Sequence, residues 1–156
     1  MALVGRHDLL LVSNFANYPT ISSTAEPFEC VVYQLLVPEK SMPDQIYVLS
    51  SETLTVPVEN ARLFPPFEAG DTKFEISYTA EWQNDDGDWD DLPENLIKYY
   101  ADEQVFHVLS GHEEFVGEHQ VRVTARVTSV PTALVYFDWT LDVVMPEMEV
   151  FEGVTN

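Results

Sequence analysis

One stretch of this chain, residues 73–82, reads KFEISYTAEW and alternates between two kinds of side chain. Charged and small polar residues occupy one set of positions, and apolar or aromatic residues occupy the other. Successive side chains of a β-strand point to opposite faces of a sheet, so this period of two predicts a half-buried strand. The face expected to point inward carries Phe74, Ile76, Tyr78, Ala80 and Trp82.

The same alternation recurs in residues 54–58, 121–126 and 137–143, and no long stretch repeats at the helical period. Turn residues separate these stretches. The turn signals are Pro65-Pro66, Ala69-Gly70-Asp71, Asp86-Gly87-Asp88, Ser110-Gly111 and Val130-Pro131-Thr132. Short strands at regular spacing with turns between them predict an all-β sandwich or barrel.

Composition and charge narrow the class of protein. The chain has 156 residues, 46% of them apolar, which is enough for one domain, or for one domain and part of another. Seven Lys and Arg against 27 Asp and Glu give a net charge of −20, which disfavours nucleic acid and anionic lipid as partners. No apolar stretch approaches the roughly 18 residues that span a bilayer, and the first residues lack the pattern of a signal peptide.

A short pattern occurs twice in the chain. Gly5-Arg6-His7 and Pro19-Thr20 reappear as Gly117-Glu118-His119 and Pro131-Thr132, and each glycine precedes its proline by 14 residues. A strand that ends in Pro-Glu follows each copy, at Val37-Pro38-Glu39 and at Met145-Pro146-Glu147. The copies lie 108 to 112 residues apart, which is close to the size of one sandwich domain.

The repeat predicts a division into three parts. Residues 1–40 are expected to be the last two strands of a preceding, incomplete Ig-like module, and residues 44–145 one complete β-sandwich. Residues 146–156 are then a linker or the first strand of a next module. Because two strands alone are marginally stable in water, we expect the hairpin in residues 5–37 to be completed. A preceding chain segment, another subunit, or docking onto the complete module would do so, which makes other Ig-like modules the predicted partners.

The second half of the chain also carries a series of motifs in a fixed order. They are Tyr78-Thr79-Ala80-Glu81-Trp82, Asp86-Gly87, Leu92-Pro93, Leu96, Phe106 before Ser110-Gly111, Gly117 with Val121, Val123 and Ala125, and Phe137 with Leu141 and Val143. With these motifs, residues 44–145 resemble the dystroglycan-type cadherin-like, or Ig-like, domain family. The resemblance implies a seven-stranded Greek-key β-sandwich of the cadherin type. It also implies strings of such repeats, located outside the cell or at its surface.

The function that these features favour is that of a non-enzymatic structural or adhesive repeat module in an extracellular filament or stalk. Ser110-Gly111 lacks the preceding glycine of a nucleophile elbow, so nucleophilic catalysis has little support. The alternative is a ligand-binding module that recognises carbohydrate or protein. Its candidate contact surface consists of Trp89, Tyr99 and Tyr100, which are predicted to lie in loops.

An acidic cluster in residues 84–91 is a candidate calcium site that would stiffen the junction between modules. Its candidate ligands are Asp85, Asp86, Asp88, Asp90 and Asp91. Calcium takes about six to eight oxygen ligands, which such a cluster could partly supply. An EF-hand is excluded because Trp82 and Pro93 would fall at its first and last ligand positions. The alternative is an exposed hairpin whose charges are solvated.

Histidine and cysteine give weaker signals. His107, His112 and His119 lie close in sequence, but zinc ligands must converge, and the counterpart of His119 in the other copy, His7, indicates a structural role. Cys30 is the single cysteine, so no disulfide forms within one chain. Aligning the two copies by their Pro-Glu pairs makes Cys30 equivalent to Asp138. This places Cys30 on the outward face, as an exposed thiol.

Overall fold

A computed structural model describes residues 4–9, 12–15, 18–24, 27–64 and 75–147. Within these ranges the chain is built from strands, and its one helical segment is a short 3-10 turn, Glu113–Phe115. The all-β fold predicted from the alternating stretches is confirmed. The predicted turns at 65–66 and 69–71, residues 73 and 74, and residues 148–156 lie outside the described residues. No described helix is long and apolar enough to cross a membrane.

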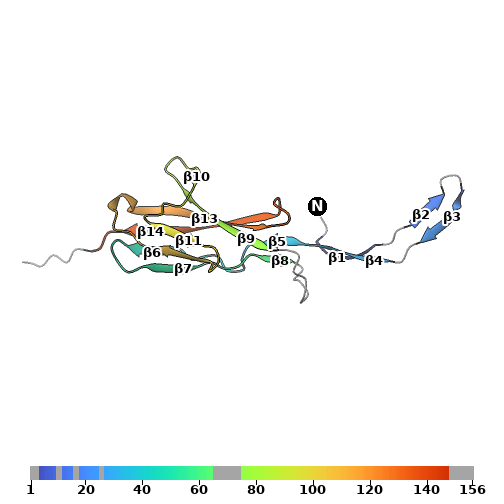
Figure 1. Ribbon diagram of the computed structural model, residues 1–156, viewed down its shortest axis with the longest axis horizontal. Helices are drawn as coiled ribbons and strands as arrows, with labels where there is room; N and C mark the ends of the chain where they lie inside the picture. Colours follow the sequence, from blue (N-terminus) through green and yellow to red (C-terminus); the bar gives the residue numbers. More distant parts are fainter. Residues whose placement is uncertain (1–3, 10–11, 16–17, 25–26, 65–74, 148–156) are drawn as a thin grey trace, which may run out of the picture.

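Two sheets pack face to face in residues 45–144 (Figure 1). The larger sheet has the order β10 (Trp89–Asp90), β9 (Ile76–Gln83), β13 (Gly117–Val127), β14 (Leu134–Val144), β6 (Gln45–Val48). The smaller sheet has the order β11 (Ile97–Tyr100), β12 (Val105–Val108), β7 (Leu54–Pro57). β6 runs parallel to β14, and the other neighbours are antiparallel. This strand order is that of an Ig-like Greek-key sandwich.

The core lies between the two sheets and includes residues that the alternation assigned to the inner faces. On β13 and β14, Val121, Val123 and Leu141 are fully buried, and Trp139 is 2% exposed. The ring of Phe106, on β12 of the other sheet, lies 5.2 Å from the ring of Trp139. Each large apolar side chain that is fully buried contributes about 1.5–3 kcal/mol, so this face of β13 and β14 holds the sandwich together.

A buried hydroxyl fixes the end of the sandwich at which β13 begins and β14 ends, here called the C-terminal pole. The backbone N–H of Ser110 donates to the Tyr47 hydroxyl at 3.0 Å, and that hydroxyl donates to the Ser110 carbonyl at 3.2 Å. The backbone N–H of Ser50 donates to the same carbonyl. The Ser-Gly turn signal therefore marks a buried anchor of the β12–β13 connection.

A two-stranded ribbon, here called the arm, extends from the opposite end of the sandwich (Figure 1). Its strands are β1 (Gly5–Leu9), β2 (Val12–Phe15), β3 (Tyr18–Thr24) and β4 (Phe28–Val32). β1 pairs with β4, and β2 pairs with β3. After β4 the chain enters β5 (Gln34–Leu36), which pairs with β8 (Arg62–Phe64) and thereby joins the arm to the sandwich.

Candidate functional site

The arm repeats the hairpin that closes the sandwich. Gly5 pairs with Val32 at the base of the arm, and Gly117 pairs with Val143 at the start of β13. Both glycines have positive φ angles, 128° and 137°, a conformation that disfavours other residues. The base of the arm therefore has the same local pairing as the start of β13, whereas Pro19 lies within β3 and its counterpart Pro131 lies in the turn before β14.

Equivalent residues of the two hairpins also lie on equivalent faces. Paired residues of neighbouring strands point to the same face, so Leu9 and Phe28, which pair in the arm, correspond to Val121 and Trp139 in the sandwich. The sandwich pair is 0% and 2% exposed, whereas Leu9 is 42% and Phe28 52% exposed. Positions that form the centre of the core in one copy are thus half-exposed in the other.

The opposite face of each hairpin carries an ion pair. In the arm, Nη1 of Arg6 lies 2.8 Å from Oε1 of Glu29. Glu29 is two residues from Val31, the cross-strand partner of Arg6, so both side chains point to the same face. In the sandwich, Nε and Nη2 of Arg122 each donate to an Asp138 carboxylate oxygen at 2.8 Å. The arm therefore has a polar face and an apolar face, here called the apolar arm face, which includes Leu9, Phe28, Cys30 and Val32.

The outward placement expected for Cys30 is wrong. Cys30 pairs with His7, and the corresponding sandwich pair is His119 with Leu141, which is fully buried. Pro38 lies six positions after Val32, but Pro146 lies three positions after Val143. A shift by an odd number of residues moves a strand residue to the other face, so alignment by the prolines reversed the orientation of Cys30.

The sandwich hairpin has neighbours that the arm lacks among the described strands. β13 is flanked by β9, and β14 by β6, and the inner face of both packs on the smaller sheet. β1 and β4 pair with each other alone in the part of the chain that the structure describes. Among the described strands, β1 and β4 are therefore each paired along one side only, whereas β13 and β14 are each paired along both sides.

The acidic cluster spans the turn between β9 and β10, the strand β10 itself and the residue after it, and all five candidate calcium ligands are exposed. The Asn84 side chain organises this turn. Its Oδ1 accepts from the backbone N–H groups of Asp86 and Asp88, and its Nδ2 donates to Asp90 at 2.7 Å. Within the described ranges, no group of three or more His, Cys, Asp or Glu side chains is placed to share a metal ion. Calcium binding therefore stays a prediction.

Trp89 lies on the short strand β10, not in the expected loop, and the guanidinium of Arg122 stacks on its ring. The Arg122 guanidinium lies 4.0 Å from the centre of the Trp89 ring and 4.1 Å from that of Tyr136. The hydrogen bonds to Asp138 raise the pKa of Arg122 further above its usual value. This stack anchors the outer face of the larger sheet.

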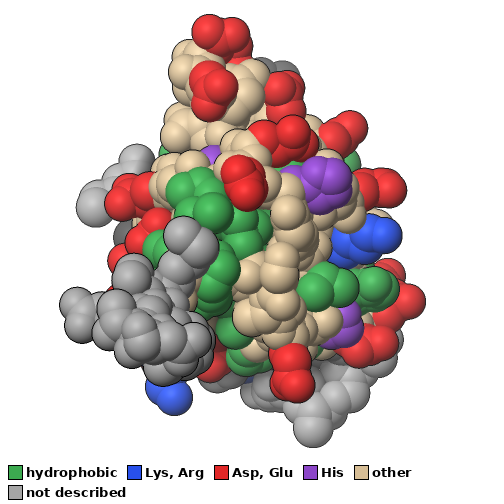
Figure 2. All heavy atoms as spheres, turned by 90° about the vertical axis from the view of Figure 1, so that its left-hand side faces the viewer, with side chains coloured by type: hydrophobic (Ala, Val, Ile, Leu, Met, Phe, Trp, Pro, Cys, Tyr) green, Lys and Arg blue, Asp and Glu red, His purple; other side chains and the backbone are tan. Residues whose placement is uncertain are grey.

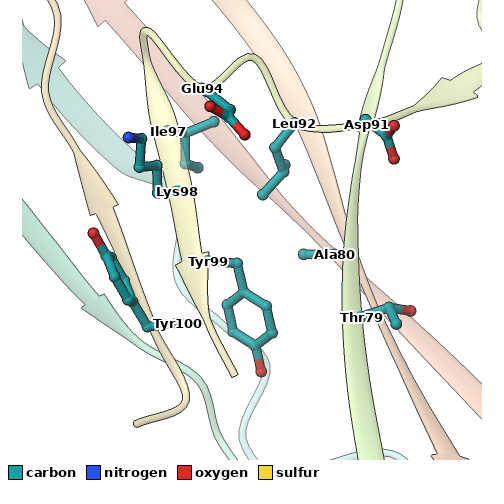
Figure 3. A pocket seen from close by; sticks show the side chains of 9 residues that line it. All are labelled: Thr79, Ala80, Asp91, Leu92, Glu94, Ile97, Lys98, Tyr99 and Tyr100. Carbon is teal, nitrogen blue, oxygen red and sulfur yellow. The ribbon is translucent and has the colours of Figure 1, made fainter. Parts of the chain in front are cut away.

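Tyr99 and Tyr100 lie on strand β11, so their expected loop position is also wrong, because residues 97–100 extend the smaller sheet. The two side chains project from opposite sides of this strand and line a pocket of about 540 Å³ between β9 and β11 (Figure 3). The Tyr99 ring lies 4.8 Å from Phe106, and burial raises its pKa to about 12. Its hydroxyl is buried and has no hydrogen-bond partner among the described residues. Trp89 does not line this pocket, so the three aromatic residues form no single surface.

The histidines make separate contacts. Nε2 of His119 lies 2.8 Å from the Phe115 carbonyl oxygen, and its ring stacks on Trp82 at 4.3 Å. The His107 ring lies beside Tyr100, and that of His112 meets the edge of Phe115. These contacts support the structural role inferred for His119.

Comparison with known proteins gives a loose likeness. No family model matches the chain, and no curated protein matches it. Among the solved structures that match is a complex of Ig domains, the titin M10–obscurin-like 1 complex, at 14% identity. The match covers 74% of this chain and 97% of that one, with a TM-score of 0.37. The Ig-like assignment therefore rests on the strand order and register of the chain itself.

Proposed function

We propose that the chain is a non-enzymatic structural or adhesive unit in a tandem array of Ig-like sandwiches. The arm supplies the last two strands of the sandwich that precedes residues 44–145. The observation that carries this proposal is the shared register and sidedness of the arm and the β13–β14 hairpin. Their equivalent central residues are apolar in both hairpins, Leu9 and Phe28 in the arm and Val121 and Trp139 in the sandwich, but the arm pair is half-exposed.

The path of the chain explains how such an array would transmit force. β4 would be the last strand of one sandwich, and only Tyr33 separates it from β5, which pairs with β8 of the next. Tension would pass through strands that are hydrogen-bonded on both sides of the junction, with no flexible linker between them. Successive sandwiches would thus form a continuous stalk or filament.

The resemblance to the dystroglycan-type cadherin-like family supports an extracellular or cell-surface location for this array. The apolar arm face supports Ig-like strands as the partner, because it carries the residue pattern that the sandwich buries against its own strands. In this proposal calcium has no required role at the junction.

A tandem chain tests the proposal. It joins residues 44–116 directly to Gly5 of the full chain, so that the arm takes the place of β13 and β14 in the first copy. We expect calorimetry to show a second unfolding unit of about the size of the first, because per-residue enthalpies of globular domains are similar. The control carries Leu9→Asp and Phe28→Asp, which place two charges in the new core. A tandem chain with the unfolding enthalpy of the single chain would contradict the proposal.

The pocket between β9 and β11 supports a second function, recognition of a small polar ligand such as a sugar. It combines a tyrosine ring with charged groups, Asp91, Glu94 and Lys98, as ligand sites usually do. Glycan-array binding that is lost in Tyr100→Ala but kept in Trp89→Ala would favour it. No binding to any glycan by the unmodified chain would remove it.

A further inference from the structure

An apolar pocket of about 330 Å³ lies where the arm meets the sandwich, and is here called the socket. Its lining comes from segments far apart in sequence: Val31 and Val32 of β4, Leu35 of β5, Leu63 of β8, and Val127 and Val130 at the end of β13. Around it, Leu35 and Val127 belong to a second buried cluster that is separate from the main core. An open recess of this composition at a chain junction marks a contact surface.

The register of the arm indicates which segment reaches the socket. Gly5 pairs with Val32, one of the socket residues, so the start of β1 lies beside the socket. The residue before Gly5 is Val4, and the residue before Gly117 is Val116. In the sandwich, this position ends the β12–β13 connection, residues 109–116.

The β12–β13 connection exposes apolar side chains at the C-terminal pole. Leu109 is 54% exposed, Val116 44% and Met145, just beyond β14, 49%. Figure 2 faces this pole and shows hydrophobic side chains near its middle, with acidic ones around them. The sandwich thus has an apolar projection at one end and an apolar recess at the other.

Charge favours the same pairing. The connection carries Glu113 and Glu114, both exposed. Exposed Arg126 directly precedes Val127, which lines the socket, whereas Arg62, before Leu63, already forms an ion pair with Glu39. In a chain of net charge −20, the Arg126 guanidinium near the recess reduces the repulsion of an acidic loop.

We infer that the socket receives the β12–β13 connection of the preceding sandwich, in a head-to-tail contact that repeats along the array. This inference rests on the proposed tandem array. It adds that the joint between sandwiches is a packed apolar contact, so neighbouring modules hold a fixed orientation. The occupant is specific: the residues equivalent to Leu109 and Val116, which lie at the two ends of the connection that leads into the first strand of the arm.

The tandem chain allows a matched test. Val130→Asp places a carboxylate on the socket wall, whereas Ser129→Asp adds the same charge at the neighbouring exposed position, which does not line the socket. Nitrogen-15 relaxation reports whether the two sandwiches tumble together. We expect one shared correlation time for the parent tandem chain and for Ser129→Asp, and two shorter, distinct times for Val130→Asp.

The loop side of the joint provides an internal control. Val116→Asp in the first copy faces the socket and is expected to abolish the shared correlation time. The same change in the second copy leaves it unaffected. Equal behaviour of the two copies, or of Val130→Asp and Ser129→Asp, would overturn the inference. These outcomes differ from failure of the array itself, in which the second unfolding unit is absent from the parent tandem chain.

Discussion

Substitutions at equivalent positions of the two hairpins distinguish a hairpin that is packed in the core of the sandwich from one that is half-exposed in the arm. Trp139 is 2% exposed and contacts Phe106 across the sandwich, whereas Phe28, at the same position of the arm, is 52% exposed. Truncating a buried Trp to Ala costs about 3–5 kcal/mol, because apolar contacts are lost and a cavity remains. Phe28 belongs to neither buried cluster, so Phe28→Ala is expected to cost about 0.5 kcal/mol or less.

Urea unfolding followed by far-ultraviolet circular dichroism measures both values on the full chain. In the tandem chain the contrast is expected to disappear for the first sandwich, where Phe28→Ala should cost about 3–5 kcal/mol. A loss above 2 kcal/mol on Phe28→Ala in the single chain would refute the reasoning, since the arm would then be packed already. A tandem chain whose free energy of unfolding does not change on Phe28→Ala would refute the reasoning equally.

Further predictions concern the sandwich alone. Tyr47→Phe removes the acceptor of the buried Ser110 N–H and is expected to cost about 1–3 kcal/mol in urea unfolding, whereas a cost near zero would rule out this anchor. Burial holds the pKa of Tyr99 at about 12, above its ordinary value of 10.0, so the unfolded chain releases this proton first. Its contribution to stability is complete below pH 10.0 and is lost as the pH rises toward 12, and Tyr99→Phe should show a smaller loss in this window. Arg122→Lys keeps the charge but loses the two-pronged bond to Asp138, so we expect a loss of at most about 1 kcal/mol. The candidate calcium site in the β9–β10 turn predicts that millimolar calcium raises the melting temperature and that Asp86→Asn abolishes this rise, and an unchanged melting temperature would remove the site.

The alternation of the sequence was sufficient for the main strands because a period of two places residues directly on faces of a sheet. Residues 76–82, 121–126 and 137–143 therefore lie in strands whose expected inner sides are buried or partly buried. The strands that carry Trp89 and Tyr99 span two and four residues. Such short segments show too few alternations to be separated from loops, and they become strands only by pairing with neighbours.

The arm hairpin was predictable because its sequence repeats that of the β13–β14 hairpin. The glycine-to-proline spacing located the second hairpin, but it could not determine the orientation of Cys30, which depends on β5 leaving the arm to pair with β8. Nor could spacing indicate the socket, because Val32, Leu63 and Val130 are brought together only by the fold. Exposure of Leu9 and Phe28 likewise depends on which strands flank β1 and β4, and among the described strands these two pair only with each other.

The alkylation rate of Cys30 tests the tandem array most directly. Cys30 is the single cysteine and lies on the apolar arm face, partly exposed, where its sandwich equivalent Leu141 is fully buried. In the single chain we expect a neutral maleimide to react freely with this thiol. In the tandem chain the thiol should react at least about a hundredfold more slowly, because access then requires unfolding of a complete domain. Equal rates in the two chains would contradict the account.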